Sequence, residues 1–164
     1  MAADQYRRLS PEAVLATVRS LPRRYRSELA HDPSVDIEAD ARRAGAPSPT
    51  SFVAETAARL AALADAVHRA AVLEHPNVTI AASTASNART PEDALGALDR
   101  SVAHAAEVID ALPASAWERR ANVTGVGSGA TATDMSVLEL AQETARIGAE
   151  GLRELGALLK KLPR

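Results

Sequence analysis

The stretch SVLELAQETARIGAEGLRELGALLKKL, residues 136–162, decides the fold. Its apolar and small residues recur at alternating intervals of three and four, the spacing of one face of an α-helix. Ser136 and Glu139 have the spacing of a capping box, which marks the start of that helix. A second set widens the face, so we expect the helix to lie deep in a bundle. The first set is Leu138, Ala141, Ala145, Gly148, Leu152, Leu155, Leu159 and Leu162, and the second is Leu140, Ile147, Gly151 and Leu158.

Three further segments have the same kind of apolar stripe and a clear start signal. Ser10-Pro11, Ser48-Pro49 and Thr90-Pro91 each place a capping hydroxyl before a proline at the first helical position. Pro22 lies inside the first segment, where it predicts a kink or a restart. The four predicted helices span about residues 11–30, 49–74, 91–112 and 135–162.

The composition agrees with a single helical domain over residues 1–164. The chain is 46% hydrophobic but 2% aromatic, with 37 alanines and 17 leucines, so β-formers are scarce. We therefore predict an all-α four-helix bundle, with a further short helix around residues 35–43. The connection at residues 76–89 is long enough to run the length of the bundle. It favours an up-down-down-up topology with a crossover between the second and third helices.

Charge and residue usage exclude several classes of protein. The chain has no cysteine, which excludes a disulfide scaffold, a catalytic thiol and thiolate metal ligands. The formal net charge of −2 gives no reason to expect nucleic-acid binding, and no apolar run is long enough to span a membrane. The first residues lack the apolar region of a secretory signal. We therefore expect a cytoplasmic, bacterial protein, and we interpret the two Asn-Val-Thr triplets at residues 77–79 and 122–124 as chance glycosylation matches.

Two groups of charged residues are candidates for a binding site. Glu55 and Arg59 are four residues apart on the second predicted helix, a spacing that allows an ion pair. Glu143, Arg146 and Glu150 have similar spacing on the fourth, so Arg146 can pair with either glutamate. These residues either form a solvated face laced by salt bridges or line a cleft between the second and fourth helices.

The four histidines give a weaker signal. His31, His68, His75 and His104 are best interpreted as surface or boundary residues. His104 and Glu107 have a spacing that can place both on one metal ion, so a metal site around His104 stays open as an alternative. The glycine-rich run at residues 125–129 lacks a phosphate-binding pattern and favours a flexible loop.

Three segments carry a resemblance to a known superfamily. They are SFVAETAARL at residues 51–60, ASAWERR at residues 114–120 and LAQETARIGAEGLREL at residues 140–155. With the order of the helices, they resemble the DinB-like (YfiT-like) bundles, which include mycothiol-dependent maleylpyruvate isomerases and bacillithiol transferases. The resemblance implies a four-helix bundle in which histidines of the second and fourth helices hold zinc or nickel. That metal activates a thiol or a water molecule.

The residues at the family's metal positions cannot serve as ligands. Those positions hold Arg59, Ile147 and Gly151, none of which offers an imidazole, carboxylate or thiolate. We therefore expect no metal and no cofactor at this place. Instead, Arg59 is expected to stand where the cation would be and to pair with Glu143 or Glu150.

Three hypotheses about function follow. The first is a metal-free DinB-like bundle that acts as a small-molecule-binding or interaction module, forms a homodimer and takes a small anionic or thiol ligand. The second is a divergent thiol-dependent transferase or isomerase, in which Arg59 holds an anionic substrate and Glu55, Glu143 or Glu150 acts as acid or base. The third is a metal site relocated to His104 and Glu107. A packed interior favours an interaction module, and an open polar pocket favours a ligand binder or an enzyme.

Overall fold

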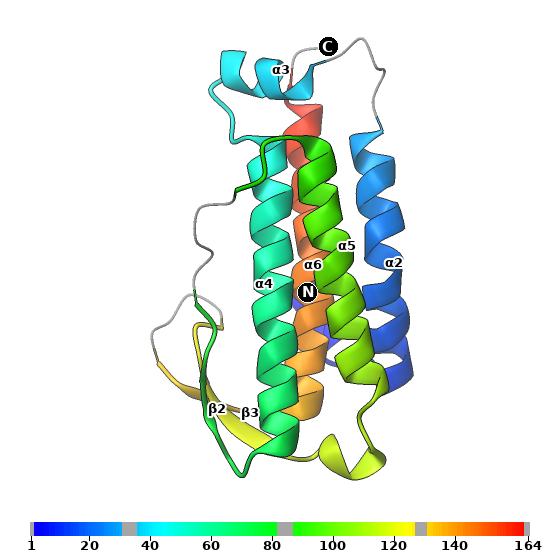
Figure 1. The fold of residues 1–164 in the computed structure, drawn as a ribbon, viewed down its shortest axis with the longest axis vertical. Coiled ribbons are helices and arrows are strands. Elements are labelled where there is room, and N and C mark those ends of the chain that lie inside the picture. The colour runs from blue at the N-terminus through cyan, green and yellow to red at the C-terminus, as the bar shows by residue number, and fades with distance from the viewer. Residues whose placement is uncertain (1, 31–35, 82–86, 127–130, 163–164) are drawn as a thin grey trace.

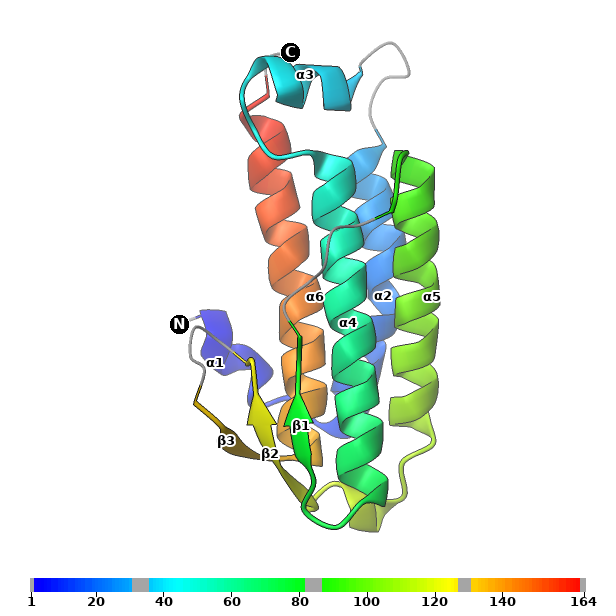
Figure 2. The same ribbon diagram turned by 60° about the vertical axis from the view of Figure 1, so that its left-hand side comes forward.

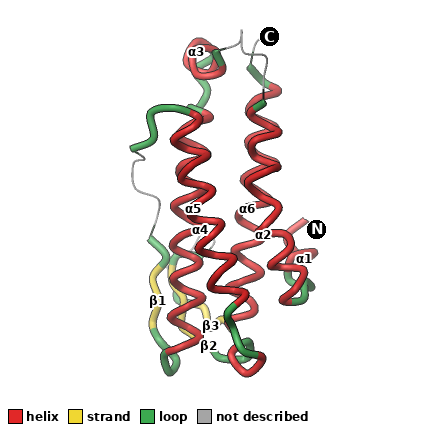
Figure 3. The backbone as a smooth tube through the Cα atoms, turned by 45° about the vertical axis from the view of Figure 1, so that its right-hand side comes forward, coloured by secondary structure: helices red, strands yellow, loops and turns green. Residues whose placement is uncertain are grey.

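Four long helices form a bundle in the computed structural model, which describes all residues except 1, 31–35, 82–86, 127–130 and 163–164 (Figure 1). α2 and α4 each pack against both α5 and α6, so the four helices occupy the corners of a square. The tube in Figure 3 shows the shorter elements at the ends of the bundle and beside it on two flanks. The long helices are α2 (Pro11–Leu29), α4 (Pro49–Val72), α5 (Pro91–Asp110) and α6 (Val137–Lys160).

The helices run up, down, down and up in chain order, as the long connection predicts (Figures 1 and 2). Polar side-chain contacts between helices agree with these directions. Asp65 of α4 and His104 of the parallel α5 lie 2.9 Å apart. Arg19 of α2 reaches Asp110 near the end of the antiparallel α5 at 3.1 Å.

The predicted start signals are all present. The side chains of Ser10, Ser48, Thr90 and Ser136 each accept a hydrogen bond from a backbone N–H three residues later. α2 continues through Pro22, so the helix does not restart there. α6 begins at Val137 because the residues just before it pair as a strand.

One short helix lies across an end of the bundle and another lies along its side (Figure 2). α3 (Ile37–Arg43) corresponds to the predicted short helix, of which residue 35 lies outside the described residues. Glu38 of α3 accepts hydrogen bonds at 2.7 Å from the Thr50 N–H and from the Ser48 hydroxyl, so it caps the N-terminus of α4. α1 (Ala2–Tyr6) was not predicted and packs against α6. A 3₁₀ turn, η1 (Ala114–Ala116), follows α5.

A three-stranded sheet corrects the all-α prediction. Its strands β1 (Asn77–Thr79), β2 (Arg120–Thr124) and β3 (Thr133–Ser136) lie in the order β1-β2-β3 along the lower side of the bundle (Figure 2). β1 is parallel to β2 and pairs the two Asn-Val-Thr triplets residue for residue. β3 is antiparallel to β2. The two connections expected as loops therefore contain the sheet, whose Val78 and Val123 are buried.

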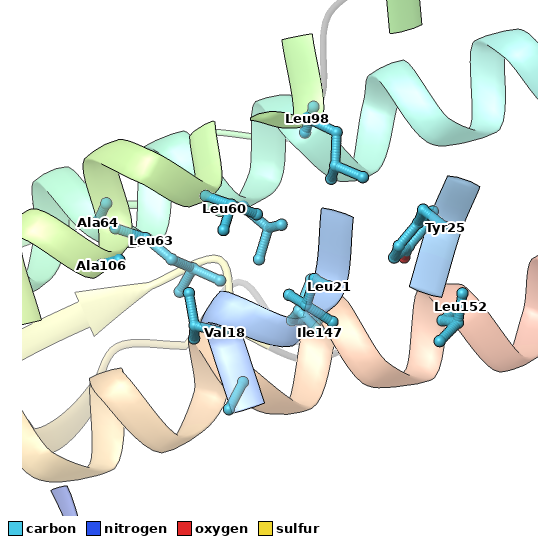
Figure 4. Packing of buried hydrophobic residues seen from close by; sticks show 14 of the residues in the cluster. Val18, Leu21, Tyr25, Leu60, Leu63, Ala64, Leu98, Ala106, Ile147 and Leu152 are labelled. Carbon is cyan, nitrogen blue, oxygen red and sulfur yellow. The ribbon is translucent and has the colours of Figure 1, made fainter. Parts of the chain in front are cut away.

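The contact between α2 and α6 depends on glycine. A Cβ added at Gly148 would lie 2.3 Å from Cδ1 of the fully buried Leu21. Figure 4 shows Leu21 beside Ile147 where these two helices meet. Alanine and glycine on α6 thus let the helices approach closely, so the core is filled without the bulky side chains that the aromatic-poor composition lacks.

The same substitution at two helical glycines should have opposite effects. Gly148→Ala should lower the free energy of unfolding by about 1–3 kcal/mol, because Leu21 must move within a packed core. Gly96→Ala on α5 should raise it by about 0.5–1 kcal/mol through helix propensity, since the nearest atom to its new Cβ, on Arg100, lies 3.5 Å away. Urea unfolding of both variants measures these changes. Equal effects would contradict a tight α2–α6 contact.

Candidate functional site

The three positions at which the DinB-like resemblance implies a metal line a small recess between α4 and α6. Arg59, Ile147 and Gly151 line it, and its volume is about 90 Å³. Glu55 and Glu150 also line this recess, and Arg59 and Glu55 are exposed. A space of this size holds a few water molecules at most and is well below the size of a typical ligand pocket.

Tyr25 closes the interior beside this recess. Its side chain is fully buried, and its hydroxyl donates to the Gly148 carbonyl oxygen at 2.9 Å. A Cβ at Gly151 would lie 2.6 Å from that hydroxyl and 3.2 Å from the Thr56 side chain. No ligating side chain fits at position 151 without displacing Tyr25. The donor set and the packing therefore both disagree with the metal site that the DinB-like resemblance implies.

Arg59 does not take the role expected of it. Within the described residues it forms no ion pair with Glu55, Glu143 or Glu150. Glu143 and Glu150 pair with Arg146 instead, because these residues lie three and four positions from it on α6. Its Nε donates to Glu143 Oε2 at 2.7 Å, and its Nη1 donates to Glu150. Hydrogen bonding to Glu143, supported by the charge of both glutamates, raises the pKa of the Arg146 guanidinium.

A larger cleft lies on the neighbouring face of α6, between α1, β3 and the first half of α6. It encloses about 450 Å³, within the usual range for small-molecule sites. We call it the lateral cleft. Its lining residues come from four parts of the chain and are Tyr6, Arg7, Val126, Thr133, Asp134, Met135, Glu139, Gln142, Glu143 and Arg146.

One face of α6 forms the floor of the lateral cleft. Glu139, Gln142, Glu143 and Arg146 have the spacing i, i+3, i+4 and i+7, so they project to the same side. The capping box fixes the first of them, because Glu139 accepts from the Ser136 N–H at 2.6 Å. Gln142 is 6% exposed and donates through Nε2 to the Leu9 carbonyl oxygen at 2.9 Å. That bond ties the chain after α1 to the floor of the cleft.

A second arginine, Arg120, links strand β2 to β3 and to the floor of the cleft. Arg120 of β2 donates to Asp134 of β3 at 2.6 Å, and its Nη2 lies 3.8 Å from Glu139. The hydrogen bond to Asp134 is the main cause that raises the pKa of Arg120. His75, whose φ is 43°, lies 3.8 Å from Asp134. The carboxylates of the cleft are thus held in place by guanidinium groups.

The histidines do not converge. His104 contacts Asp65 of α4 at 2.9 Å, but the described residues contain no group of three or more metal-ligating side chains. His68 and His75 are exposed at separate places, and His31 lies outside the described residues. Gly127 and Gly129 of the glycine-rich run also lie outside them. Within the described residues, no further ligating group therefore completes a metal site around His104 and Glu107.

The structure divides the five predicted site residues. Glu143 and Arg146 line the lateral cleft, whereas Glu55, Arg59 and Glu150 line the small recess. The cleft predicted between the second and fourth helices is thus a minor feature. Sequence reasoning missed the contributions of Tyr6, Arg7, Asp134 and Gln142. The helical spacing from Glu139 was the signal that could have indicated the polar floor.

Comparison of the chain with protein-family models, with curated proteins and with solved structures finds no match in any of the three. The structure itself establishes a mainly helical domain of packed helices with a small sheet. In the described part of the chain, no helix combines the length and apolarity that a bilayer crossing requires.

Tyr25 should make stability depend on pH in alkaline solution. Burial raises the pKa of this phenol above its ordinary value of 10.0. Its contribution is therefore complete below pH 10 and is lost as the pH rises toward the folded-state pKa, by at most about 1.4 kcal/mol per pH unit. Tyr25→Phe should lower the free energy of unfolding by about 0.5–1.5 kcal/mol at pH 7, because it removes the hydrogen bond to Gly148. Above pH 10 the free energies of unfolding of the variant and of the unmodified protein should converge.

Tyr6→Phe is the matched control, because it retains Tyr25 and should keep the alkaline loss of the unmodified protein. Urea unfolding at pH 7, 9, 10 and 11 measures all three proteins. A parallel alkaline decline in the unmodified protein and in Tyr25→Phe would show that the buried phenol does not cause it.

Proposed function

We propose that this chain is a DinB-like bundle without the family's metal site and that it acts as a small-molecule-binding module. The observation that carries the proposal is the lateral cleft, where polar groups from α1, β3 and α6 converge on a volume suited to a small ligand. The up-down-down-up order and the three resembling segments support the DinB-like assignment. The closed interior at Gly151 supports the absence of the metal.

The location of the cleft favours a binding module over a transferase or isomerase. A divergent transferase or isomerase needs Arg59 and a glutamate at one substrate, but Arg59 lies at a recess of about 90 Å³. An anionic ligand was expected because of Arg59, and that reason does not extend to the lateral cleft. A binding module requires only the cleft, so it is the function that the geometry supports best.

The homodimer expected from sequence stays a prediction. Among the described residues, the large hydrophobic side chains that are exposed are Val72 at 57% and Leu73 at 46%. Two side chains are far fewer than the core of a stable interface contains. Size-exclusion chromatography with light scattering distinguishes monomer from dimer.

Blocking the lateral cleft should abolish ligand binding. Thr133 lines the cleft, so Thr133→Trp places an indole in it. Fragments that shift cleft amide signals in ¹⁵N spectra of the unmodified protein should no longer do so in this variant. Thr79→Trp is the matched control, since Thr79 is an exposed strand residue outside the cleft lining. Fragment binding that survives Thr133→Trp, or signals that shift around Arg59 instead, would place the site elsewhere.

Metal analysis tests the other half of the proposal. Protein purified without chelator and dialysed should hold substoichiometric zinc and nickel, because the family positions lack donors and no described cluster replaces them. His104→Ala should not change the metal content. Stoichiometric zinc or nickel after dialysis would contradict the metal-free assignment, and its loss in His104→Ala would restore the relocated site.

A further inference from the structure

Strand β3 has one paired edge and one free edge, and the free edge borders the lateral cleft. β3 is the last strand in the order β1-β2-β3, so β2 covers one of its two edges. Thr133 and Met135 lie opposite buried residues of β2, on the side of the sheet that faces the bundle. Asp134 lies between them and faces the outer side. Because residues from both sides of the strand line the cleft, the cleft meets β3 at its free edge, beside α1 (Figure 2).

The pairing register shows which backbone groups of β3 point to that free edge. Val137 N–H donates to the Arg119 carbonyl oxygen at 2.8 Å, and this pair continues the register of β2 and β3. Opposite residues exchange hydrogen bonds at every second position of an antiparallel pair. Met135 and Ala121 therefore form the next hydrogen-bonded pair. The N–H and C=O of Asp134 point away from β2, to the free edge.

These two groups of Asp134 can take a further partner. The Asp134 N–H has no hydrogen-bond partner among the described residues. The carbonyl oxygen accepts from Arg120 Nη2 at 3.2 Å, which leaves its second lone pair free. Ser136 is the next residue whose backbone points to this edge, and its N–H already donates to Glu139. Asp134 thus offers one donor and one acceptor side by side, as a strand does to a neighbouring strand.

The edge of β3 lacks two common features that block further pairing. Natural edge strands are often protected by proline or lysine, and β3 contains neither. The carboxylate of Asp134 does not repel a neutral main chain, because Arg120 holds it at 2.6 Å.

The charged side chains in and next to the cleft balance one another. Four guanidinium groups and four carboxylates lie there, so the cleft favours neither a cation nor an anion by net charge. They are Arg7, Arg120, Arg146 and Arg153, and Asp134, Glu139, Glu143 and Glu150. A neutral ligand with main-chain hydrogen-bonding groups therefore suits this cleft better than an ion.

We infer that the lateral cleft binds a short, uncharged, extended segment of another polypeptide, which pairs with the free edge of β3. A guest residue opposite Asp134 accepts from its N–H and donates to its C=O. Tyr6, Val126 and Met135 line the same cleft and provide apolar surface for the guest side chains. A volume of about 450 Å³ admits a segment of a few residues. The inference rests on the proposed function, because it specifies what occupies the same cleft.

Three related tripeptides test this inference in ¹⁵N spectra of the unmodified protein at pH 7. They are acetyl-Ala-Val-Ala-amide, the same peptide with all three residue nitrogens methylated, and Ala-Val-Ala with free termini. The capped peptide should shift the Asp134 amide proton downfield in a saturable manner and slow its exchange with deuterium, because this N–H gains an acceptor. The methylated peptide should bind at least about tenfold more weakly, since its residues have no N–H to donate. Free termini should not increase the affinity.

Proline substitution tests the edge of β3 directly. Asp134→Pro removes the free N–H without breaking a hydrogen bond to β2. Asp134→Ala is the matched comparison, because it also lacks the carboxylate but keeps the N–H. The capped peptide should bind Asp134→Pro about tenfold more weakly than Asp134→Ala. Equal unfolding midpoints of the two variants show that the difference does not come from misfolding.

The other free edge of the sheet provides the control. The Ile80 N–H donates to the Thr124 carbonyl oxygen, so the N–H of the preceding Thr79 points away from β2. Thr79→Pro makes the same kind of change on β1, outside the cleft lining. It should not change the affinity for the capped peptide.

The outcomes separate this inference from the proposed function. If fragments occupy the cleft but the capped peptide does not, the peptide assignment is overturned while a binding module stands. Equal affinities for the capped and methylated peptides, or of Asp134→Pro and Asp134→Ala, would overturn main-chain pairing on β3. A loss of affinity in Thr79→Pro would place the peptide on β1, and tighter binding of the free termini would exclude an uncharged segment. If neither fragments nor peptides shift cleft amides, the proposed function itself fails.

Discussion

The hydroxyl of Tyr25 donates to the carbonyl oxygen of Gly148 at 2.9 Å, and this fully buried bond joins α2 to α6. It forms because Gly148 and Gly151 carry no Cβ, which leaves room for Leu21 and for the phenol. Because α2 and α6 are parallel and in close contact, α4 and α5 occupy the other two corners of the square. The same packing fills the place where the DinB-like resemblance expects a metal. A single constraint therefore explains both the close bundle and its closed interior.

The parallel arrangement of α4 and α5 has its own consequence. A chain that leaves the lower end of α4 must return to the upper end before α5 begins, and in doing so it passes along the bundle. β1 lies on that return path, and its backbone pairs with β2 from the connection between α5 and α6. The sheet is thus a product of the crossover. It also positions β3 beside α6 and so builds one wall of the lateral cleft.

Local signals predicted the helices well, because caps and apolar spacing act within a few residues. Ser10, Ser48, Thr90 and Ser136 each begin a helix as the sequence indicates. The sheet was missed because its strands have three to five residues, too few to show an alternating pattern, and join residues 77 and 122. The repeated Asn-Val-Thr triplet, with its β-branched residues, was a strand signal that was taken for a chance glycosylation match.

In the candidate site, too, local features were predictable from the sequence and long-range features were not. The pairing of Arg146 with Glu143 and Glu150 follows from spacing within one helix, so sequence predicted it. Which elements cover that polar face depends on α1 and β3, and no pattern in α6 records them. Partial burial then gives the pairing a meaning that it lacks on an open surface. On a solvated helix such a pairing contributes little, whereas at 13–21% exposure the guanidinium and its two carboxylates are partly removed from water and depend on one another. This partial burial distinguishes the polar face of α6 from an ordinary solvated helix face, and it is the reason for proposing that face as the floor of a binding site.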